Sequence, residues 1–318
     1  MRVVVVGEGM IELSRGQGGW RLGHGGDTLN MAIHLARFGR DVAYATALGT
    51  DPFSDDLRAA WAAEGLDTSF ILSDPQSSPG LYAIRTDASG ERSFTYWRAR
   101  SAARRLFALE GAERVTEAAS AADLLCLSLI SLAVLPPAGR EALIDLCRRV
   151  QASGGRVAFD GNYRPKLWES TAEARAARDA VIACCDIGLP TLEDEAALSG
   201  ASDAEAVADE WRSLGAEEVV VKLGGEGCLV EGGIVPPPVR LDPVDTSGAG
   251  DAFDAGYLHA RLSGVRPAEA AVAGHRLAGW VVMRAGAIPT ADGDAPYAGW
   301  PERSDPESSH DPSIPGVG

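Results

Sequence analysis

The sequence of 318 residues is poor in cysteine and contains no long apolar run. Its five cysteines form no Cys-x-x-Cys pair, and the adjacent Cys184 and Cys185 are poorly spaced for metal ligation, so we expect buried cytosolic thiols. No apolar stretch approaches the length of a membrane span. The four valines after Arg2 are too few for the apolar region of a secretory signal. We therefore expect a cytoplasmic protein with no membrane partner.

The sequence also lacks basic charge, because 29 Lys and Arg residues face 45 Asp and Glu residues, for a formal net charge of −16. A protein that binds a nucleic-acid backbone needs a basic stripe, so we expect no nucleic-acid partner. The acidity would also repel an anionic ligand at long range, and an acidic substrate would need arginines placed close to it. The composition, 46% hydrophobic and 23% charged, suits one large α/β domain with a small appendage.

Two common nucleotide-binding motifs are missing as well. Residues 7–10, GEGM, resemble the start of a dinucleotide fingerprint, but the third glycine is not at the required spacing and no helix follows directly. The sequence contains no Walker A motif, which disfavours a P-loop NTPase. An NAD-dependent dehydrogenase therefore stays an outside alternative.

Strand-like and helix-like segments alternate along most of the chain. Short apolar or β-branched runs predict strands, and apolar residues at three-to-four spacing predict helices. The expected strands are 3–6, 41–49, 124–129, 156–160, 186–190 and 218–224, and the expected helices are 28–38, 54–64, 138–152, 171–183, 193–199, 251–263 and 267–284. Such alternation implies an α/β fold with a mainly parallel sheet and helices on both faces.

The segment 80–98 departs from this alternation. Two extended runs around a turn rich in Asp, Ser and Gly predict a β-hairpin. Phe94, Tyr96 and Arg98 then share one face, because side chains alternate along a strand. We expect a small β appendage over the edge of the main sheet, and a disordered tail over 301–318, which is rich in proline and serine.

Two glycine-rich segments each allow two interpretations. In 23–39, Gly26 either belongs to a flexible loop before a capped helix or lets a ligand approach the backbone, with Asp27 and Asn30 binding its hydroxyls. The segment 219–230, VVVKLGGEGCLV, is either a plain hairpin or a turn that carries a nucleotide.

The segments around Asn162 and Asp251 raise the same question. Asn162 and Arg164 follow the carboxyl end of a strand, where open α/β sheets bind ligands, so a ligand contact is favoured over a surface turn. In DTSGAGDAFDAGYL, residues 245–258, Asp251 either caps a helix or acts as a base beside an anion hole made by the amides of 248–250.

Together, GGDTLNMA, TALGTD, FDGNYRP, VVVKLGGEG and DTSGAGDAFDAGYL resemble, in the same order, the motifs of the ribokinase-like carbohydrate kinases, the PfkB family. The resemblance covers about 3–290, and DTxGAGD is its most specific mark. It implies a ribokinase-like three-layer α/β/α sandwich, with a kinase domain over 1–300 and a small β lid formed by about 12–24 and 78–100.

Within that family, GEGMIEL, GGDTLN, FTYWRARSAAR and NYRPKLWES look like the 2-keto-3-deoxygluconate kinases. Those enzymes phosphorylate the 6-hydroxyl of 2-dehydro-3-deoxy-D-gluconate with ATP and Mg²⁺. A 2-keto-3-deoxygalactonate kinase, a fructokinase, a ribokinase and a non-catalytic sugar or nucleotide sensor stay open as alternatives. Lid edges in such kinases often pair across a dimer, so the resemblance also suggests a homodimer.

The resemblance implies roles for individual residues. Asp251 matches the catalytic base, and the amides of Gly248, Ala249 and Gly250 match the anion hole. The residues that match ATP-binding positions are Asn162, Arg164, Lys222, Gly224, Gly225, Gly227, Gly248 and Gly250. Those that match positions facing the sugar acid are Gly26, Asn30, Tyr82, Tyr96, Arg98, Arg164 and Asp251. Asp245 and Asp194 match positions that hold the metal through water.

Two stretches depart from the family pattern. Thr191 and Asp194, in TLEDE, stand where many relatives carry Asn and Glu, which weakens the assignment of a metal contact there. We assign no substrate contact to 284–289, RAGAIP. We also expect Asp251 to stay ionised and to orient the accepting hydroxyl more than to remove its proton.

Overall fold

The computed structural model describes residues 1–16, 18–86 and 92–298. The turn of the predicted hairpin and the tail expected to be disordered lie outside these ranges. Within them, no helix combines the length and the apolar character that crossing a bilayer requires.

A nine-stranded sheet forms the centre of the molecule, in the order β13-β12-β11-β10-β9-β8-β1-β4-β5. Every neighbouring pair from β11 to β5 is parallel, and β12 and β13 add an antiparallel edge, so the prediction of a mainly parallel sheet is confirmed. Its strands are β1 (Arg2–Val6), β4 (Asp41–Leu48), β5 (Ile71–Ser73), β8 (Leu124–Ser128), β9 (Arg156–Asp160), β10 (Ile187–Gly188), β11 (Glu218–Lys222), β12 (Cys228–Val230) and β13 (Gly233–Val235).

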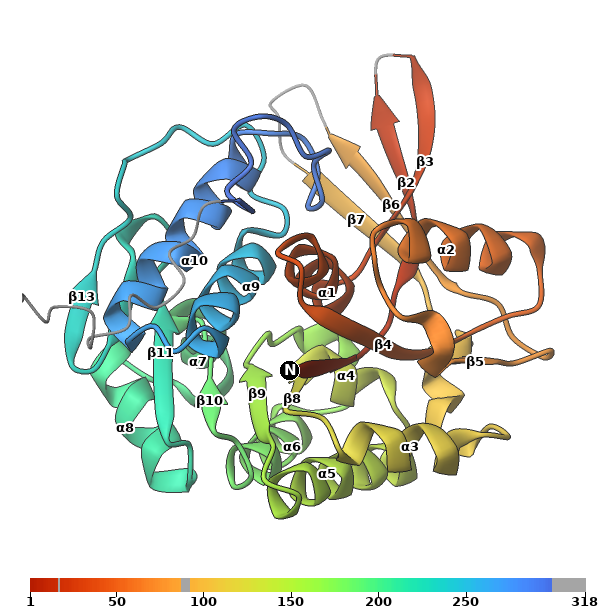
Figure 1. Cartoon of the computed structure of the whole chain (residues 1–318), viewed down its shortest axis with the longest axis horizontal. Helices are drawn as coiled ribbons and strands as arrows, with labels where there is room; N and C mark the ends of the chain where they lie inside the picture. Colours follow the sequence, from red (N-terminus) through yellow and green to blue (C-terminus); the bar gives the residue numbers. More distant parts are fainter. Residues whose placement is uncertain (17, 87–91, 299–318) are drawn as a thin grey trace, which may run out of the picture.

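Helices cover both faces of this sheet (Figure 1). Side chains alternate along β1, so Val3 and Val5 enter one apolar core while Val4 and Val6 enter the other. The first core is completed by α1 (Asp27–Arg37), α2 (Pro52–Ala63), α9 (Ala249–Leu262) and α10 (Pro267–Val282). The second is completed by α3 (Ala112–Ser120), α4 (Leu129–Val134), α5 (Pro137–Ala152), α6 (Thr171–Ile182), α7 (Leu192–Ser199) and α8 (Ala204–Leu214). Short 3-10 helices are η1 (Thr68–Phe70), η2 (Ala102–Ala108), η3 (Pro165–Leu167) and η4 (Gly224–Glu226).

Three helices, α3, α4 and α8, have no counterpart in the sequence prediction. The strand expected over 124–129 ends at Ser128, whose hydroxyl accepts the amide of Ser131 at 3.2 Å and so caps α4. A similar cap signal precedes α8, where Asp203 accepts the amide of Ala206 at 2.9 Å. The strand predicted over 186–190 is reduced to the two residues of β10.

A second sheet, which we call the lid sheet, projects from one end of the molecule (Figure 1). Its order is β3-β2-β6-β7, with β2 (Met10–Gly16), β3 (Gly19–Gly25), β6 (Gly80–Thr86) and β7 (Arg92–Trp97). Strands β6 and β7 are antiparallel with Tyr82 opposite Tyr96, which confirms the predicted hairpin. The rings of Phe94 and Tyr96 stack at 6.3 Å between centroids, so these two residues share a face as expected.

Candidate active site

Most of the predicted site residues gather where the parallel strands end. Ser128, Asp160 and Lys222 are the last residues of β8, β9 and β11. Asp27 is the first residue of α1 and Asp251 is the third of α9, and both helices begin at this same edge of the sheet. Open α/β sheets bind their ligands at this edge, because loops and helix N-termini converge there.

The loop before α9 presents backbone amides. Gly248 has a φ of 70°, a left-handed conformation that favours glycine, and a Cβ there would lie 2.5 Å from the Cβ of Ala287. The amide of Ala249 donates to the carbonyl of Thr246 at 3.3 Å. The amides of Gly248 and Gly250 meet no protein acceptor among the described residues. Two of the three amides predicted for the anion hole are therefore open to a ligand.

Asp251 does not occupy the capping position of α9, because the N-cap is Gly248 and Asp251 is the third residue of the helix. Its Oδ2 instead accepts a hydrogen bond from Asn30 Nδ2 at 2.7 Å. Burial, with a smaller contribution from the charge of Asp27, raises the pKa of Asp251 to about 8, although the bond from Asn30 works in the opposite direction. The expectation that Asp251 stays ionised at neutral pH is therefore wrong. A pKa near the operating pH suits a general base better than an ordinary carboxylate does.

Lys222 lies beneath the anion-hole loop and pairs with two carboxylates. Its Nζ donates to Asp160 Oδ1 at 2.9 Å and to the two oxygens of Asp254 at 3.0 and 2.9 Å. Burial raises the pKa of Asp254 well above its usual value, against the pull of Lys222. Burial alone would lower the pKa of Lys222, but the two carboxylates raise it overall. A Cβ on Gly250 would be 3.8 Å from Nζ, so the lysine places a fixed charge under the first turn of α9.

Asp27 joins the ends of three elements. Its Oδ2 accepts hydrogen bonds from Ser128 Oγ at 2.5 Å and from Asn162 Nδ2 at 3.2 Å. Burial raises the pKa of Asp27, the bond from Ser128 opposes that shift, and the charge of Asp160 adds to it. The side-chain oxygens of Asn30 and Asn162 are buried and have no partner in the described part of the chain. Since buried polar atoms are normally paired, these two oxygens mark a surface that takes a polar ligand.

Arg98, predicted to face an acidic substrate, has its own buried counter-ion. Its Nε donates to Glu8 Oε2 at 2.7 Å, and the Glu8 side chain is 1% exposed. The guanidinium also lies over the ring of Tyr96, 5.9 Å from its centroid. Gly26 also packs against Glu8, because a Cβ on Gly26 would lie 2.3 Å from the carbonyl oxygen of Glu8. Glu8 therefore fixes the position of two residues predicted to face the substrate.

Tyr82 and Tyr96 lie on the same face of the lid sheet, with ring centroids 5.9 Å apart. The hydroxyl of Tyr82 donates to Glu12 Oε2 at 2.5 Å, and Tyr82 is buried while Tyr96 is 50% exposed. Burial raises the pKa of both phenols, so both stay hydrogen-bond donors at neutral pH. The lid sheet thus presents two aromatic side chains with polar tips.

Arg164 forms a salt bridge with Asp194, the residue predicted to hold a metal through water. Nη1 donates to the two carboxylate oxygens at 3.1 and 3.3 Å, and the arginine side chain is 52% exposed. Burial raises the pKa of Asp194, against the effect of Arg164. Gly224, Gly225 and Gly227 form the turn between β11 and β12, so the hairpin predicted there is confirmed.

The structure limits how Mg²⁺ would be held. Asp245 accepts the amides of Ser247 at 2.9 Å and Gly286 at 2.6 Å, so this carboxylate shapes the loop before α9. No group of three or more metal-ligating side chains occurs in the ranges that the structure describes. Mg²⁺ commonly keeps several waters and binds one or two carboxylates together with substrate phosphates. Asp245 and Asp194 are already engaged, with backbone amides and with Arg164, so either would meet such an ion through water.

Sequence analysis does not select Asp160, Asp254 or Glu8. Asp254 follows Asp251 by three residues, which places both on one face of a helix. Asp160 ends a buried strand at the edge where ligands bind. Both signals are present in the sequence, whereas the pairing of Glu8 with Arg98 across the fold leaves no local signal.

Comparisons with known proteins bear on this geometry. The sequence model of the pfkB family of carbohydrate kinases matches residues 1–292. The 2-dehydro-3-deoxygluconokinase of Escherichia coli strain K12 is 43% identical over 298 residues, which cover 90% of this chain and 96% of that protein.

Two solved structures share the fold. The 2-dehydro-3-deoxygluconokinase of Thermotoga maritima matches with a TM-score of 0.81 at 22% identity, covering 92% of this chain and 96% of that one. A ribokinase II candidate of Escherichia coli, solved with ATP and Mg²⁺, matches with a TM-score of 0.78 at 23% identity, covering 90% and 94%. The ribokinase-like fold that the sequence motifs predict is therefore confirmed.

Proposed function

Because the chain belongs to the pfkB family of carbohydrate kinases, we propose that it transfers the γ-phosphoryl group of ATP to the 6-hydroxyl of 2-dehydro-3-deoxy-D-gluconate. The 43% identity to the Escherichia coli 2-dehydro-3-deoxygluconokinase, over 90% of this chain, supports that substrate. One observation carries the chemistry: the buried carboxyl of Asp251 lies one residue after Gly250, whose amide, like that of Gly248, is open.

In the proposed reaction, the 6-hydroxyl oxygen forms a bond to the γ-phosphorus while the bond between that phosphorus and the ADP oxygen breaks. ADP leaves with the electron pair of the broken bond, and the hydroxyl proton passes to Asp251 in the fraction of molecules in which this carboxyl is ionised. The amides of Gly248 and Gly250 donate to the phosphoryl oxygens as charge develops on them. Asn30 holds the carboxyl through its 2.7 Å hydrogen bond. Since the transition state is loose, orientation of the hydroxyl contributes more than basicity.

For the nucleotide, the proposal uses Asn162, Arg164 and the turn formed by Gly224, Gly225 and Gly227. The ribokinase II candidate with bound ATP and Mg²⁺ supports both ligands for this fold. Bound Mg²⁺ would neutralise charge on the β- and γ-phosphates. The role of Lys222 differs from the direct contact expected from its motif. Its Nζ pairs with Asp160 and Asp254, so we assign it an electrostatic role beneath the loop.

For the sugar acid, the proposal uses Gly26, Asn30, Tyr82, Tyr96, Arg98 and Arg164. Arginine presents a fixed fork of donors that matches a carboxylate, and Glu8 holds the fork of Arg98 in one orientation. The lid sheet carries both tyrosines and would exclude water that otherwise accepts the phosphoryl group.

We also propose that lid sheets pair in a homodimer. Trp20, Leu22 and Trp97 are 47%, 59% and 59% exposed, and the strand register places them on one face of the lid sheet, opposite the face of Tyr82. Clustered exposed apolar residues mark interaction surfaces. Light scattering coupled to size exclusion should give the mass of a dimer, and Leu22→Glu should give that of a monomer. A monomeric parent protein would contradict the proposal.

The substrate is tested by ADP release with a panel of 2-keto-3-deoxygluconate, 2-keto-3-deoxygalactonate, fructose and ribose. We expect the highest kcat/KM for the gluconate derivative, by about tenfold or more. A higher value for another sugar would replace the proposed substrate. Absence of ADP release with all of them would favour a non-catalytic sensor.

The role of Asp251 is tested separately with Asp251→Asn. We expect kcat to fall by about 100-fold or more, the scale of general-base and positioning effects, with a small change in KM. Asp209→Asn, an exposed change on α8, is the matched control and should keep the parent rate. Parent-like turnover by Asp251→Asn would exclude this aspartate as the base.

A further inference from the structure

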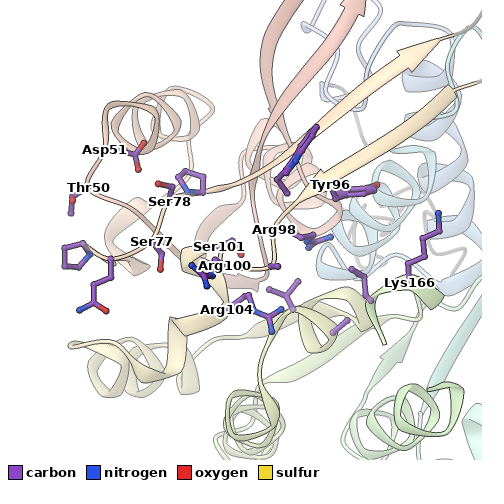
Figure 2. A pocket seen from close by; sticks show the side chains of 18 residues that line it. Thr50, Asp51, Ser77, Ser78, Tyr96, Arg98, Arg100, Ser101, Arg104 and Lys166 are labelled. Carbon is purple, nitrogen blue, oxygen red and sulfur yellow. The ribbon is translucent and has the colours of Figure 1, made fainter. Parts of the chain in front are cut away.

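A cavity of about 890 Å³ opens beside the candidate active site, at the base of the lid sheet (Figure 2). Its walls include the segment 75–79 that leads into β6 and the segment 96–101 that contains the end of β7 and its exit. Of the residues predicted to face the substrate, Tyr96 and Arg98 line it, whereas Asn30, Arg164 and Asp251 do not. The cavity therefore adjoins the Asp251 site and shares Tyr96 and Arg98 with the proposed sugar-acid site.

Three cationic side chains line this cavity without a counter-ion. Arg100, Arg104 and Lys166, labelled in Figure 2, make no salt bridge or side-chain hydrogen bond with the described residues. Arg98, in contrast, is compensated by Glu8. Three uncompensated cations around one cavity indicate an anionic ligand, all the more in a chain whose formal net charge is −16.

The acidic residue of the lining, Asp51, does not compensate these cations. Its carboxylate caps α2, where it accepts the amide of Ser54 at 3.1 Å and the hydroxyl of Ser54 at 2.8 Å. Its side chain is therefore engaged with the first turn of its own helix and makes no salt bridge with a cation of the cavity.

A buried hydroxyl also lacks a partner here. Ser101 is 4% exposed, lines the cavity, and has no hydrogen-bond partner for its Oγ in the described part of the chain. A buried polar atom without a partner destabilises the fold unless a ligand or water meets it. Thr50, Ser77 and Ser78 add further hydroxyls to the lining. The ligand should therefore carry hydroxyl groups or other hydrogen-bonding oxygens as well as charge.

We propose that this cavity is a second binding site, which takes a phosphate monoester of a small polyhydroxylated acid. Such a compound carries nearly two negative charges on its phosphate at neutral pH and one more on its carboxylate, which matches the three cations. Its hydroxyls match the serine and threonine side chains. The cavity volume also lies within the roughly 300–1,000 Å³ of small-molecule sites. The proposal does not depend on the substrate assigned to the Asp251 site.

A ligand in this cavity would join the lid sheet to the main domain. Two of the segments that connect the lid sheet to that domain meet here, where the amide of Ala102 donates to the carbonyl of Ser78 at 3.0 Å. Arg100 belongs to this connection, whereas Lys166 belongs to η3 of the main domain. Contacts to both would restrain the lid sheet, so the site can regulate the enzyme without touching Asp251.

Calorimetric titration of the full chain with 6-phosphogluconate tests the proposal, with gluconate and inorganic phosphate as the separate halves of the probe. We expect 6-phosphogluconate to bind about tenfold or more tightly than either half. Arg104→Gln should weaken its binding by about tenfold or more, Arg104→Lys by less, and Ser101→Ala severalfold without lowering the melting temperature of the ligand-free protein. Arg148→Gln, an exposed arginine on α5, should have no effect.

The variant Arg164→Gln distinguishes this cavity from the phosphoryl-transfer site, because Arg164 lies outside the lining. Binding of 6-phosphogluconate should stay within about twofold of the parent value in this variant. A loss equal to or greater than that of Arg104→Gln would place the probe at the Asp251 site and overturn the proposal. Absence of measurable binding to the folded parent protein would overturn it as well.

Discussion

Two buried ionic clusters in this molecule differ in how their charges are balanced. In the cluster between α6, α7 and α8, Arg178 is fully buried and every nitrogen of its guanidinium meets a carboxylate. Nε donates to Asp179 at 2.9 Å, Nη1 to Glu195, and Nη2 to Glu210 at 2.8 Å. Burial raises the pKa of Glu195 to about 7 even though Arg178 lowers it. This arrangement ties three helices together.

In the cluster at the start of α9, buried carboxylates outnumber the cation, whereas around Arg178 Glu195 is fully buried and Asp179 and Glu210 are 34% and 25% exposed. Lys222 pairs with Asp160 and Asp254, while Asp27 and Asp251 add two more acidic groups whose pKa values burial raises. The unpaired side-chain oxygens of Asn30 and Asn162 also lie here.

The difference separates a structural cluster from a functional one. An excess of buried acidic groups destabilises a fold, since each ionised carboxylate must give up its water. Such an excess is found where the groups exchange protons or meet a ligand, and balanced clusters hold elements together instead. The variants below test this distinction by breaking one cluster at a time.

The largest expected effect is on stability, from Arg178→Met. The change leaves the fully buried Glu195 without its cation, so we expect the free energy of unfolding to fall by roughly 3–5 kcal/mol. Urea denaturation measures it, and ADP release by the protein that stays folded should keep the parent kcat. Arg175→Met, which breaks an exposed salt bridge to Glu210, is the matched control and should cost about 1 kcal/mol or less. Equal losses for the two variants would remove the structural role assigned to Arg178.

The second-largest expected effect is a gain in stability at high pH, from Asp251→Asn in the active site. The pKa of Asp251 is raised from 3.8 to about 8, so between these values the folded protein holds a proton that the unfolded chain has lost. The contribution of this group to the free energy of unfolding therefore falls as pH rises through that window, and the loss is complete above about pH 8. We expect Asp251→Asn to melt a few degrees above the parent protein at about pH 9, and at nearly the same temperature at about pH 4. Scanning calorimetry at both pH values measures this, and a lower melting temperature for the variant at high pH would contradict it.

Much of the fold can be predicted from the sequence, because its signals are local. The apolar run 3–6 predicts a strand and the helical periodicity of 28–38 predicts a helix. The motif DTSGAGD likewise places Asp251 at the start of a helix. Helices α3 and α8 carry an apolar periodicity at least as clear as that of the predicted helices, so the sequence does contain a local signal for both. Helix α4, in contrast, begins where the hydroxyl of Ser128, the last residue of β8, caps it. Local propensity alone does not decide such boundaries.

The charge balance of the site could not be predicted in the same way. Lys222 meets Asp160, 62 residues away, and Arg98 meets Glu8, 90 residues away, so neither pair leaves a spacing to recognise. The pKa of Asp251 depends on its burial and on the charge of Asp27, which lies 224 positions earlier in the sequence. The motif around Asp251 predicts neither the burial nor the neighbouring charge. The motif indicates which residue is the base, and the surrounding fold determines when that residue is ionised.

The smallest expected effect is a shift of the pH profile by Asp27→Asn. The charge of Asp27 helps to raise the pKa of Asp251, so removing that charge should lower this pKa and let the base ionise at lower pH. The acidic limb of kcat/KM against pH should therefore move to lower pH, while Asp209→Asn leaves it in place. The asparagine keeps an oxygen that can accept the hydrogen bond from Ser128, so the fold should be retained. An unmoved limb would mean that Asp27 does not control the ionisation of Asp251, and a limb moved to higher pH would mean that Asp27 assists the loss of its proton.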